Sequence, residues 1–252
     1  MFFLLAIDTC LTTTGVALFE NEHPVAATYH RSERQHASRL LKDIDNILSS
    51  RRIGLADLKC IAVTTGPGSF TGLRVGLTTA KSLAYSHGIP VVGVNSLECL
   101  AHGVYGHRGT VAVVVDAKKN EVYAALYKTF DSLSEPIEIG VAFVDNPISA
   151  AQRLTTLAAG DTTTAQSPRD VLVVGDGALV YADVFSHCPF RSGPTLWNVV
   201  HPECVGALGL RRFAQGSAIS WEAIEPVYLR KAEAELTVGP PTGIPLMEVR
   251  NA

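Results

Sequence analysis

The glycine-rich segment at residues 66–74 is the part of the sequence whose residue types and spacing best fit a chemical role. It reads Gly-Pro-Gly-Ser-Phe-Thr-Gly-Leu-Arg and separates a short apolar stretch from a helical pattern. Glycines let a backbone approach a phosphate closely, and a helix N-terminus supplies unpaired N–H groups. A P-loop would also need a lysine and a hydroxyl at the helix start, but Leu73 and Arg74 stand there. The residues alone therefore leave two interpretations open, an anion site and a tight structural turn, and we expect Ser69 to be a helix cap.

Two aspartates could also do chemistry. Asp8 and Asp116 each follow the first strand of an expected hairpin. Such carboxylates could orient a metal-bound nucleotide across a cleft between two lobes, or could simply accept hydrogen bonds from the N–H groups of their own turns. Gly175 and Gly177 follow a later strand in a Gly-Asp-Gly segment and are weaker candidates for the same nucleotide cleft.

Metal, nucleic-acid and membrane functions find little support in the composition. The eight histidines show no metal-binding spacing, and we interpret them, His102 among them, as solvated or helix-end residues. Five scattered cysteines without a Cys-x-x-Cys pair are typical of reduced thiols in the cytoplasm. The net charge of −3 argues against an autonomous nucleic-acid binder, so we interpret three basic pairs as solvated surface, Arg51–Arg52, Lys118–Lys119 and Arg211–Arg212. No apolar run is long enough to span a bilayer, so we expect a soluble cytoplasmic protein.

The chain of 252 residues is long enough for two lobes, and its pattern repeats. Asp8 and Asp116 are 108 positions apart, and Gly66 and Gly175, which end later strands, are 109 apart. This indicates a duplicated α/β unit of hairpin, helix, strand, glycine loop and helix. Apolar runs predict strands at 3–7, 15–19, 60–63, 91–94, 111–115, 121–127 and 171–174. Helical periodicity or helix start signals predict helices at 37–48, 73–86, 96–104 and 202–213, and a further helix within 145–170.

We therefore expect two lobes of mixed sheet flanked by helices. The first lobe covers residues 1–108 and holds the hairpin, the glycine loop and the helices around it. The second covers 109–235, although its helix 202–213 could pack back on the first lobe. Residues 236–252 contain three prolines, Pro240, Pro241 and Pro245, and are expected to form an irregular tail.

The expected helix 73–86 is apolar on two sides. One face carries leucines and alanines, and a second carries small or apolar groups that include Gly76. Such a helix needs two neighbours. One is its own sheet, and the other is either the helix 36–49 or another subunit, whose backbone Gly76 would allow to come close.

Several of these segments resemble the bacterial TsaB (YeaZ) family, in the order the family has them and from about residue 4 to residue 231. The resemblance rests on Gly66-Pro67-Gly68-Ser69-Phe70-Thr71-Gly72-Leu73-Arg74-Val75-Gly76, supported by Asp8-Thr9, Gln35-His36-Ala37-Ser38, Asp116 through Glu121-Val122-Tyr123-Ala124, Gly175-Asp176-Gly177 and Pro226-Val227-Tyr228-Leu229-Arg230.

The resemblance implies the two-lobed fold of the actin–hexokinase–chaperone superfamily and a role in forming threonylcarbamoyladenosine in tRNA. It further implies that the catalytic transferase is a paralogue, TsaD, with which this chain would pair while helping to recruit the ATPase TsaE. Homodimers would form through the same helical surface, tRNA would be met only through the complex, and no cofactor of its own is expected, although nucleotide could bind at the complex interface. The interface residues implied are His36, Leu40, Gly72, Leu73, Gly76, Thr79 and Leu83.

One departure separates this chain from the transferase paralogue, which carries two metal-binding histidines in Asn-His-Met-Glu-Gly-His. The corresponding segment is Asn95-Ser96-Leu97-Glu98-Cys99-Leu100, with Ser96 and Leu100 at the histidine positions. Because leucine cannot bind a metal and serine binds one poorly, the resemblance favours a non-catalytic subunit. An ATP-dependent phosphotransferase or a metallohydrolase of the M22 peptidase type remains the alternative on the same fold.

Overall fold

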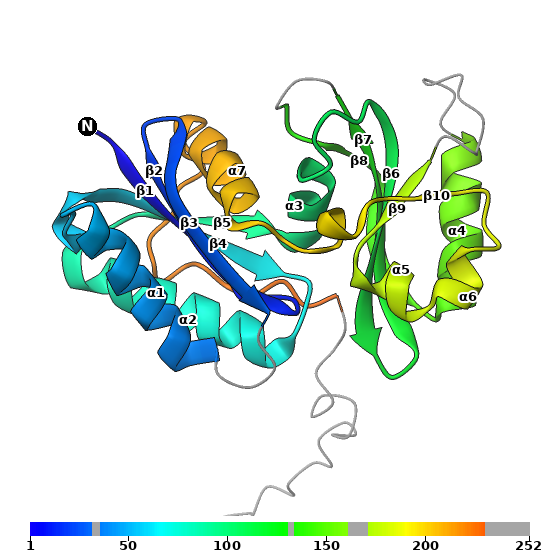
Figure 1. The fold of residues 1–252 in the computed structure, drawn as a ribbon, viewed down its shortest axis with the longest axis horizontal. Coiled ribbons are helices and arrows are strands. Elements are labelled where there is room, and N and C mark those ends of the chain that lie inside the picture. The colour runs from blue at the N-terminus through cyan, green and yellow to red at the C-terminus, as the bar shows by residue number, and fades with distance from the viewer. Residues whose placement is uncertain (32–35, 131–133, 161–170, 230–252) are drawn as a thin grey trace, which may run out of the picture.

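The computed structural model describes residues 1–31, 36–130, 134–160 and 171–229, which fold into two mixed β-sheets with helices on both sides (Figure 1). The strands are β1 (Phe3–Asp8), β2 (Thr13–Glu20), β3 (His23–Arg31), β4 (Leu58–Gly66), β5 (Val91–Asn95), β6 (Gly109–Lys118), β7 (Glu121–Thr129), β8 (Ile137–Asp145), β9 (Leu172–Val174) and β10 (Arg191–Ser192). The helices are α1 (His36–Ser50), α2 (Phe70–His87), α3 (Ser96–His102), α4 (Pro147–Gly160), α5 (Asp176–Val180), α6 (Ala182–Phe185) and α7 (Pro202–Ala214), with short 3-10 turns at Leu55–Asp57 and Thr195–Asn198.

The two sheets have the same topology. The first has the strand order β3-β2-β1-β4-β5, and the second, read in the same direction, β8-β7-β6-β9-β10. In each sheet the first three strands along the chain form antiparallel pairs, and the fourth pairs parallel with the first. The duplication expected from the two sequence offsets is thus present in the strand order, and the expected α/β fold of two lobes with mixed sheets flanked by helices is confirmed.

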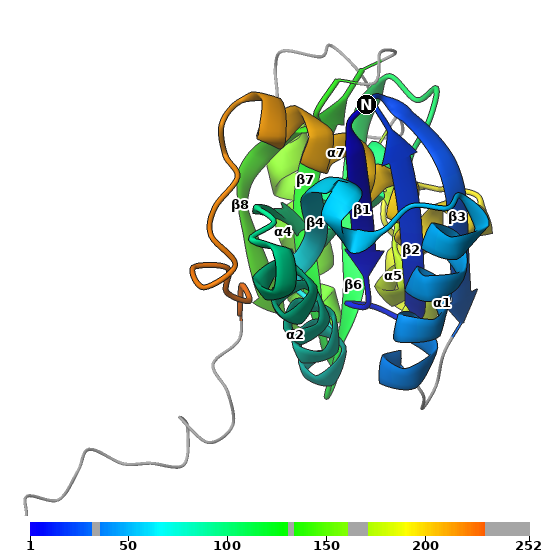
Figure 2. The ribbon, with the colours of Figure 1, turned by 90° about the vertical axis from the view of Figure 1, so that its left-hand side faces the viewer.

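Helices cover both faces of each sheet. Helices α1 and α2 lie on the outer face of the first sheet, and α4 to α6 lie on the outer face of the second (Figures 1 and 2). Helices α3 and α7 lie between the sheets, where a single apolar cluster joins side chains of both inner faces (Figure 1). Burial of this apolar surface is the main favourable contribution to folding and fixes the two sheets around one shared core.

Helix α7 belongs spatially to the first sheet, although it follows the second along the chain. Its Gly209 faces Ala62 of β4, and its Gly206 faces the ring of Phe19 on β2, so the helix backbone lies close to the sheet. The chain then returns along the first sheet, where Ile219 forms an antiparallel bridge with Val91. The C-terminal segment of the described chain therefore completes the first sheet and not the second.

The sequence pattern missed three strands, β3, β8 and the two-residue β10. All three lie at sheet edges and lack the apolar runs that reveal central strands, because β3 and β8 alternate only partly between buried and exposed positions and β10 is exposed. Helix α2 begins at Phe70, three residues before the predicted start, because Ser69 caps it. The expected tail, 236–252, lies outside the described residues. Among the helices described, none is long and apolar enough to cross a membrane.

Candidate functional site

The glycine-rich loop is filled by the tip of the first hairpin. The N–H of Ser69 donates to the carbonyl oxygen of Cys10 at 2.7 Å, and the hydroxyl of Thr9 donates to the carbonyl oxygen of Gly72 at 2.7 Å. The Ser69 hydroxyl accepts from the N–H of Gly72 at 3.3 Å, which is the helix cap that the sequence predicted. Backbone carbonyls of the same chain thus lie at the end of α2 to which a phosphate would bind, which favours the tight structural turn of the two interpretations.

Three glycines of this region make the close approach of the hairpin tip sterically feasible. Gly68, Gly72 and Gly76 are spaced four residues apart and therefore lie along one line at the start of α2. A Cβ at Gly68 would clash with the carbonyl oxygen of Cys10, one at Gly72 with the carbonyl oxygen of Thr9, and one at Gly76 with the hydroxyl of Thr9. The small-residue face of α2 therefore has an intramolecular neighbour, the hairpin tip.

Asp8 lies beneath this tip and is completely buried. Its Oδ1 accepts hydrogen bonds from the hydroxyl of Thr64 (2.8 Å), the N–H of Cys10 (3.2 Å) and the thiol of Cys10 (2.8 Å). Within the described chain its Oδ2 has no hydrogen-bond partner. Burial raises the pKa of Asp8 above its ordinary value, which these hydrogen bonds only partly offset. The carboxyl group therefore holds the hairpin tip in place and faces no solvent.

Asp116, the equivalent residue of the second sheet, is paired with a lysine. Its Oδ2 accepts a hydrogen bond of 2.7 Å from Lys118 Nζ, and its Oδ1 accepts from the N–H of Lys118 at 2.8 Å. The N–H of Asp116 donates to Asp176 Oδ1 at 3.0 Å. Burial raises the pKa of Asp176, and the hydrogen bond to Asp116 raises the pKa of Lys118. The Lys118 side chain is exposed, as expected for solvated surface, and its ammonium forms an ion pair with Asp116.

Gly175 and Gly177 pack against β6. A Cβ at Gly175 would clash with the carbonyl oxygen of Val114, and one at Gly177 would come within 2.8 Å of the backbone of Val115. The N–H of Gly175 donates to Asn198 Oδ1 at 2.7 Å. Asp8 thus lies in the first sheet, whereas Asp116, Gly175 and Gly177 lie together in the second.

The two positions that correspond to metal-binding histidines in the transferase paralogue have structural roles here. The hydroxyl of Ser96 is buried and donates to the carbonyl oxygen of Pro67, which connects α3 to the glycine loop. Leu100 is 1% exposed and packs in the core that the two sheets share. Over the described ranges, no group of three or more His, Cys, Asp or Glu side chains could hold a metal ion.

The sequence did not predict a partly buried ion pair between α7 and α3 or the burial of His102. Arg212 of α7 donates to Glu98 Oε2 of α3 and, at 2.7 Å, to the carbonyl oxygen of Gly93. The interpretation of Arg212 as solvated surface is therefore wrong. His102 is the last residue of α3, so of the two interpretations of the histidines it is a helix-end residue and not a solvated one. It is 6% exposed, and burial lowers its pKa to about 4. Glu98 and His102 are four residues apart, so helical spacing places them on one face of α3, the face toward α7. This spacing was the sequence signal that could have indicated a shared environment for the two side chains.

The expected partner face is only partly available for contact. Four of its seven residues are buried within the chain, namely Leu40, Gly72, Leu73 and Gly76. This corrects the expectation that these four contact a partner directly. Thr79 and Leu83 are half-buried on α2, and the side chain of His36 is outside the described residues. Helices α1 and α2 lie side by side (Figure 2), and their exposed positions include Arg39, Lys42, Arg74 and Thr78.

Comparison with known proteins agrees with this architecture. The family model described as "TsaD: tRNA N6-adenosine threonylcarbamoyltransferase" matches residues 28–237. The solved structure "YeaZ from Pseudomonas aeruginosa" is 27% identical and has a TM-score of 0.75, with 91% of this chain and 100% of that chain covered. The molecule is thus a two-lobed protein of the TsaD-type superfamily. The polar groups at the tips of its two hairpins are hydrogen-bonded within the chain.

Two bacterial relatives narrow the assignment. The tRNA threonylcarbamoyladenosine biosynthesis protein TsaB of Escherichia coli (strain K12) is 32% identical over 231 residues, which cover 90% of this chain and 94% of that protein. The protein of the same name from Bacillus subtilis (strain 168) is 31% identical over 235 residues, with 92% and 96% covered. The chain belongs to the TsaB family.

Proposed function

We propose that this chain is a non-catalytic subunit of a cytoplasmic complex that forms threonylcarbamoyladenosine in tRNA. In this proposal it pairs with a TsaD-type transferase, helps to recruit a TsaE-type ATPase, and forms a homodimer when the transferase is absent. The names of its relatives place them in this biosynthesis, and the family model matched by residues 28–237 is that of the transferase. tRNA is met only in the assembled complex.

The observation that carries the non-catalytic role is the filled glycine loop. The carbonyl oxygen of Cys10 accepts a hydrogen bond from the N–H of Ser69, and the Ser69 hydroxyl accepts one from the N–H of Gly72, so two donors at the α2 N-terminus are used within the chain. Phosphate binding at a helix N-terminus needs those donors free. Asp8 is buried, Asp116 is paired with Lys118, and Ser96 hydrogen-bonds the loop. Each group that could act in catalysis therefore already has a structural role.

Reconstitution tests this proposal. The purified chain, the TsaD-type transferase and the TsaE-type ATPase of the same organism are combined with the threonylcarbamoyl donor and unmodified tRNA. We expect modified adenosine only when this chain and the transferase are both present, and a stable complex of the two in sedimentation. Modification by this chain alone, or full activity of the transferase and ATPase without it, would show the proposal to be wrong.

A further inference from the structure

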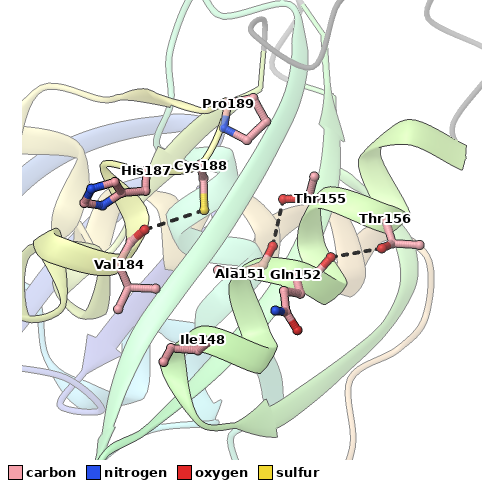
Figure 3. A pocket seen from close by; sticks show the side chains of 9 residues that line it. All are labelled: Ile148, Ala151, Gln152, Thr155, Thr156, Val184, His187, Cys188 and Pro189. Carbon is pink, nitrogen blue, oxygen red and sulfur yellow. Dashed lines mark hydrogen bonds between the residues drawn. The ribbon is translucent and has the colours of Figure 1, made fainter.

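A pocket opens on the outer side of the second lobe, between α4 and the end of α6 (Figure 3). Its volume is about 530 Å³, which lies in the usual range of small-molecule sites. Side chains of α4 form one wall, and the chain that leaves α6 forms the other. The lining consists of Ile148, Ala151, Gln152, Thr155, Thr156, Val184, His187, Cys188 and Pro189.

The pocket exists because the two lobes differ in one helix. In the first sheet β4 is followed by a single helix, α2, of 18 residues, which packs beside α1. At the same place in the second sheet β9 is followed by α5 of 5 residues and α6 of 4 residues, which are separated at Tyr181. Helix α4 has the place of α1 in the duplicated unit, so part of the space that α2 fills beside α1 stays open beside α4.

The floor of the pocket is apolar and already ordered. Ala151 is 6% exposed and belongs to the core of the second sheet, and Val184 and Cys188 pack against the same core. Ile148 is largely exposed beside them. An apolar body that enters the pocket would remove this surface from water, which favours its binding.

The lining carries no fixed charge. Its nine residues, all within the described chain, include no Asp, Glu, Lys or Arg. The Cys188 thiol donates to the carbonyl oxygen of Val184 at 3.8 Å, and burial raises the pKa of Cys188, so the thiol stays uncharged at neutral pH. A charged ligand would lose hydration here without gaining an opposite charge, so the pocket favours a neutral molecule.

The two hydroxyls of the lining are acceptors toward a ligand, because each already donates its proton to the helix backbone. Thr155 donates to the carbonyl oxygen of Ala151 at 2.8 Å, and Thr156 donates to the carbonyl oxygen of Gln152 at 3.0 Å (Figure 3). Each hydroxyl oxygen keeps lone pairs that can accept a further hydrogen bond. A ligand that matches them needs an N–H or O–H group.

We propose that this pocket binds a small neutral molecule with an apolar body and an N–H or O–H donor, the body on Ala151 and Val184 and the donor on the hydroxyl oxygens of Thr155 and Thr156. The site lies on the second lobe, away from α1 and α2, and does not depend on the proposed function (Figure 1). A nucleotide finds no cation in the lining, and a purely apolar protein segment would leave both hydroxyl oxygens without a donor.

Two pairs of probes test the ligand class. Indole and N-methylindole share an apolar ring system, but only indole has an N–H donor, while benzamide and benzoate differ in charge. Each is titrated into the isotope-labelled full chain, and amide NMR shifts give the dissociation constants. We expect shifts on α4 and α6 around the pocket and ~3–10-fold tighter binding of indole than of N-methylindole, as one hydrogen bond would give. Benzamide should bind and benzoate should not.

Three variants locate the binding. Thr78 and Thr156 are both exposed threonines on helices, but only Thr156 lines this pocket. Thr156→Trp fills the pocket and should weaken indole binding at least ~10-fold, whereas Thr78→Trp should stay within ~3-fold of wild type. The double variant Thr155→Val/Thr156→Val keeps the shape of the lining and should abolish the preference for indole over N-methylindole. Circular dichroism and thermal melts verify that each variant keeps its fold.

The proposal is overturned if indole leaves the pocket amides unshifted, or if Thr156→Trp binds it as tightly as wild type. Equal affinity for indole and N-methylindole would refute the role of the donor, and equal affinity for benzamide and benzoate would refute the preference for a neutral ligand. Loss of self-association in Thr156→Trp, measured by sedimentation, would assign the pocket to a second copy of the chain and refute a small-molecule site.

Discussion

The hydroxyl of Thr9 donates a hydrogen bond to the carbonyl oxygen of Gly72, and a Cβ at Gly76 would clash with the same hydroxyl. One side chain of the first hairpin therefore both closes the first turn of α2 and requires a glycine in the next turn. The contact joins residues 63 positions apart and fills the space that a phosphate would need. It explains why a glycine-rich loop before a helix need not bind an anion.

Gly76→Ala tests this contact. We expect a loss of ~1–3 kcal/mol in the free energy of unfolding, because the new methyl group overpacks against the Thr9 hydroxyl. Chemical denaturation measures it, with Gly160→Ala as control, since a Cβ at Gly160 meets no atom within 4 Å. In the Thr9→Ala background the penalty at Gly76 should shrink. An equal penalty in both backgrounds would show that Thr9 is not the obstacle.

Gly76→Leu places a larger side chain at the same position. Because Gly76 is buried against Thr9, we expect this variant to destabilise the monomer itself. Any loss of complex in that variant would follow from the damaged fold.

Asp8→Asn should be tolerated. Burial raises the folded-state pKa of Asp8, so the folded chain binds a proton more tightly than the unfolded chain does, and stability falls as the pH rises from the ordinary pKa of 3.8 through the folded value. Asparagine removes this loss and keeps the oxygen that accepts from Thr64 and Cys10. Denaturation at several pH values should show a variant at least as stable as wild type at pH 7, with an advantage that grows between pH 3.8 and the folded pKa of Asp8 and is constant above it.

The same variant separates a structural Asp8 from a catalytic one. In the reconstituted modification reaction, Asp8→Asn should remain within a few-fold of wild type. A general base would instead lose ~10²–10⁴ in rate. A loss of that size in a variant that folds normally would show that Asp8 takes part in catalysis.

Arg212→Met should be strongly destabilising, because it leaves the Glu98 carboxylate buried without a cation. Breaking a buried pair from one side costs ~3–5 kcal/mol. Burial already raises the pKa of Glu98 above its ordinary value of 4.5, and loss of Arg212 raises it further, so the cost is largest above the pKa of Glu98 in the folded variant and declines as the pH falls from there to the folded wild-type value. Urea denaturation of Arg212→Met, of Arg51→Met at an exposed site, and of the Glu98→Gln/Arg212→Met double variant measures this. No recovery in the double variant would contradict it.

His102 should make the fold sensitive to acid. Its pKa is lowered to about 4 by burial, so the folded chain resists the proton that the unfolded chain binds near pH 6.5. Stability from this group is complete above the unfolded pKa and is lost as the pH falls toward 4, on the order of 1–3 kcal/mol. His102→Gln should flatten that slope between pH 6.5 and 4, whereas His87→Gln, at an exposed position, should not. Equal slopes would rule out His102 as the source.

The sequence contained the central strands and the duplication, because buried strands are apolar runs and the two halves keep their spacing. The contact between Thr9 and Gly76 could not be predicted from the sequence, because it depends on how the first hairpin packs on α2. The sequence also concealed the Arg212–Glu98 pair, because a charge pattern along one helix does not reveal which distant helix it faces. Local periodicity predicts which face of a helix or strand is buried. Which other element packs against that face depends on the topology of the fold.

The position of α7 has a consequence for synthesis on the ribosome. Its glycines rest on Ala62 and Phe19, so the inner face of the first sheet is covered by a helix that is translated about 140 to 190 residues later. Until α7 emerges, that face remains exposed apolar surface, and a nascent chain stalled after the second sheet would be a natural client for chaperones. A fragment that stops at residue 108 should accordingly aggregate, and co-expression with the rest of the chain as a separate polypeptide should rescue its solubility.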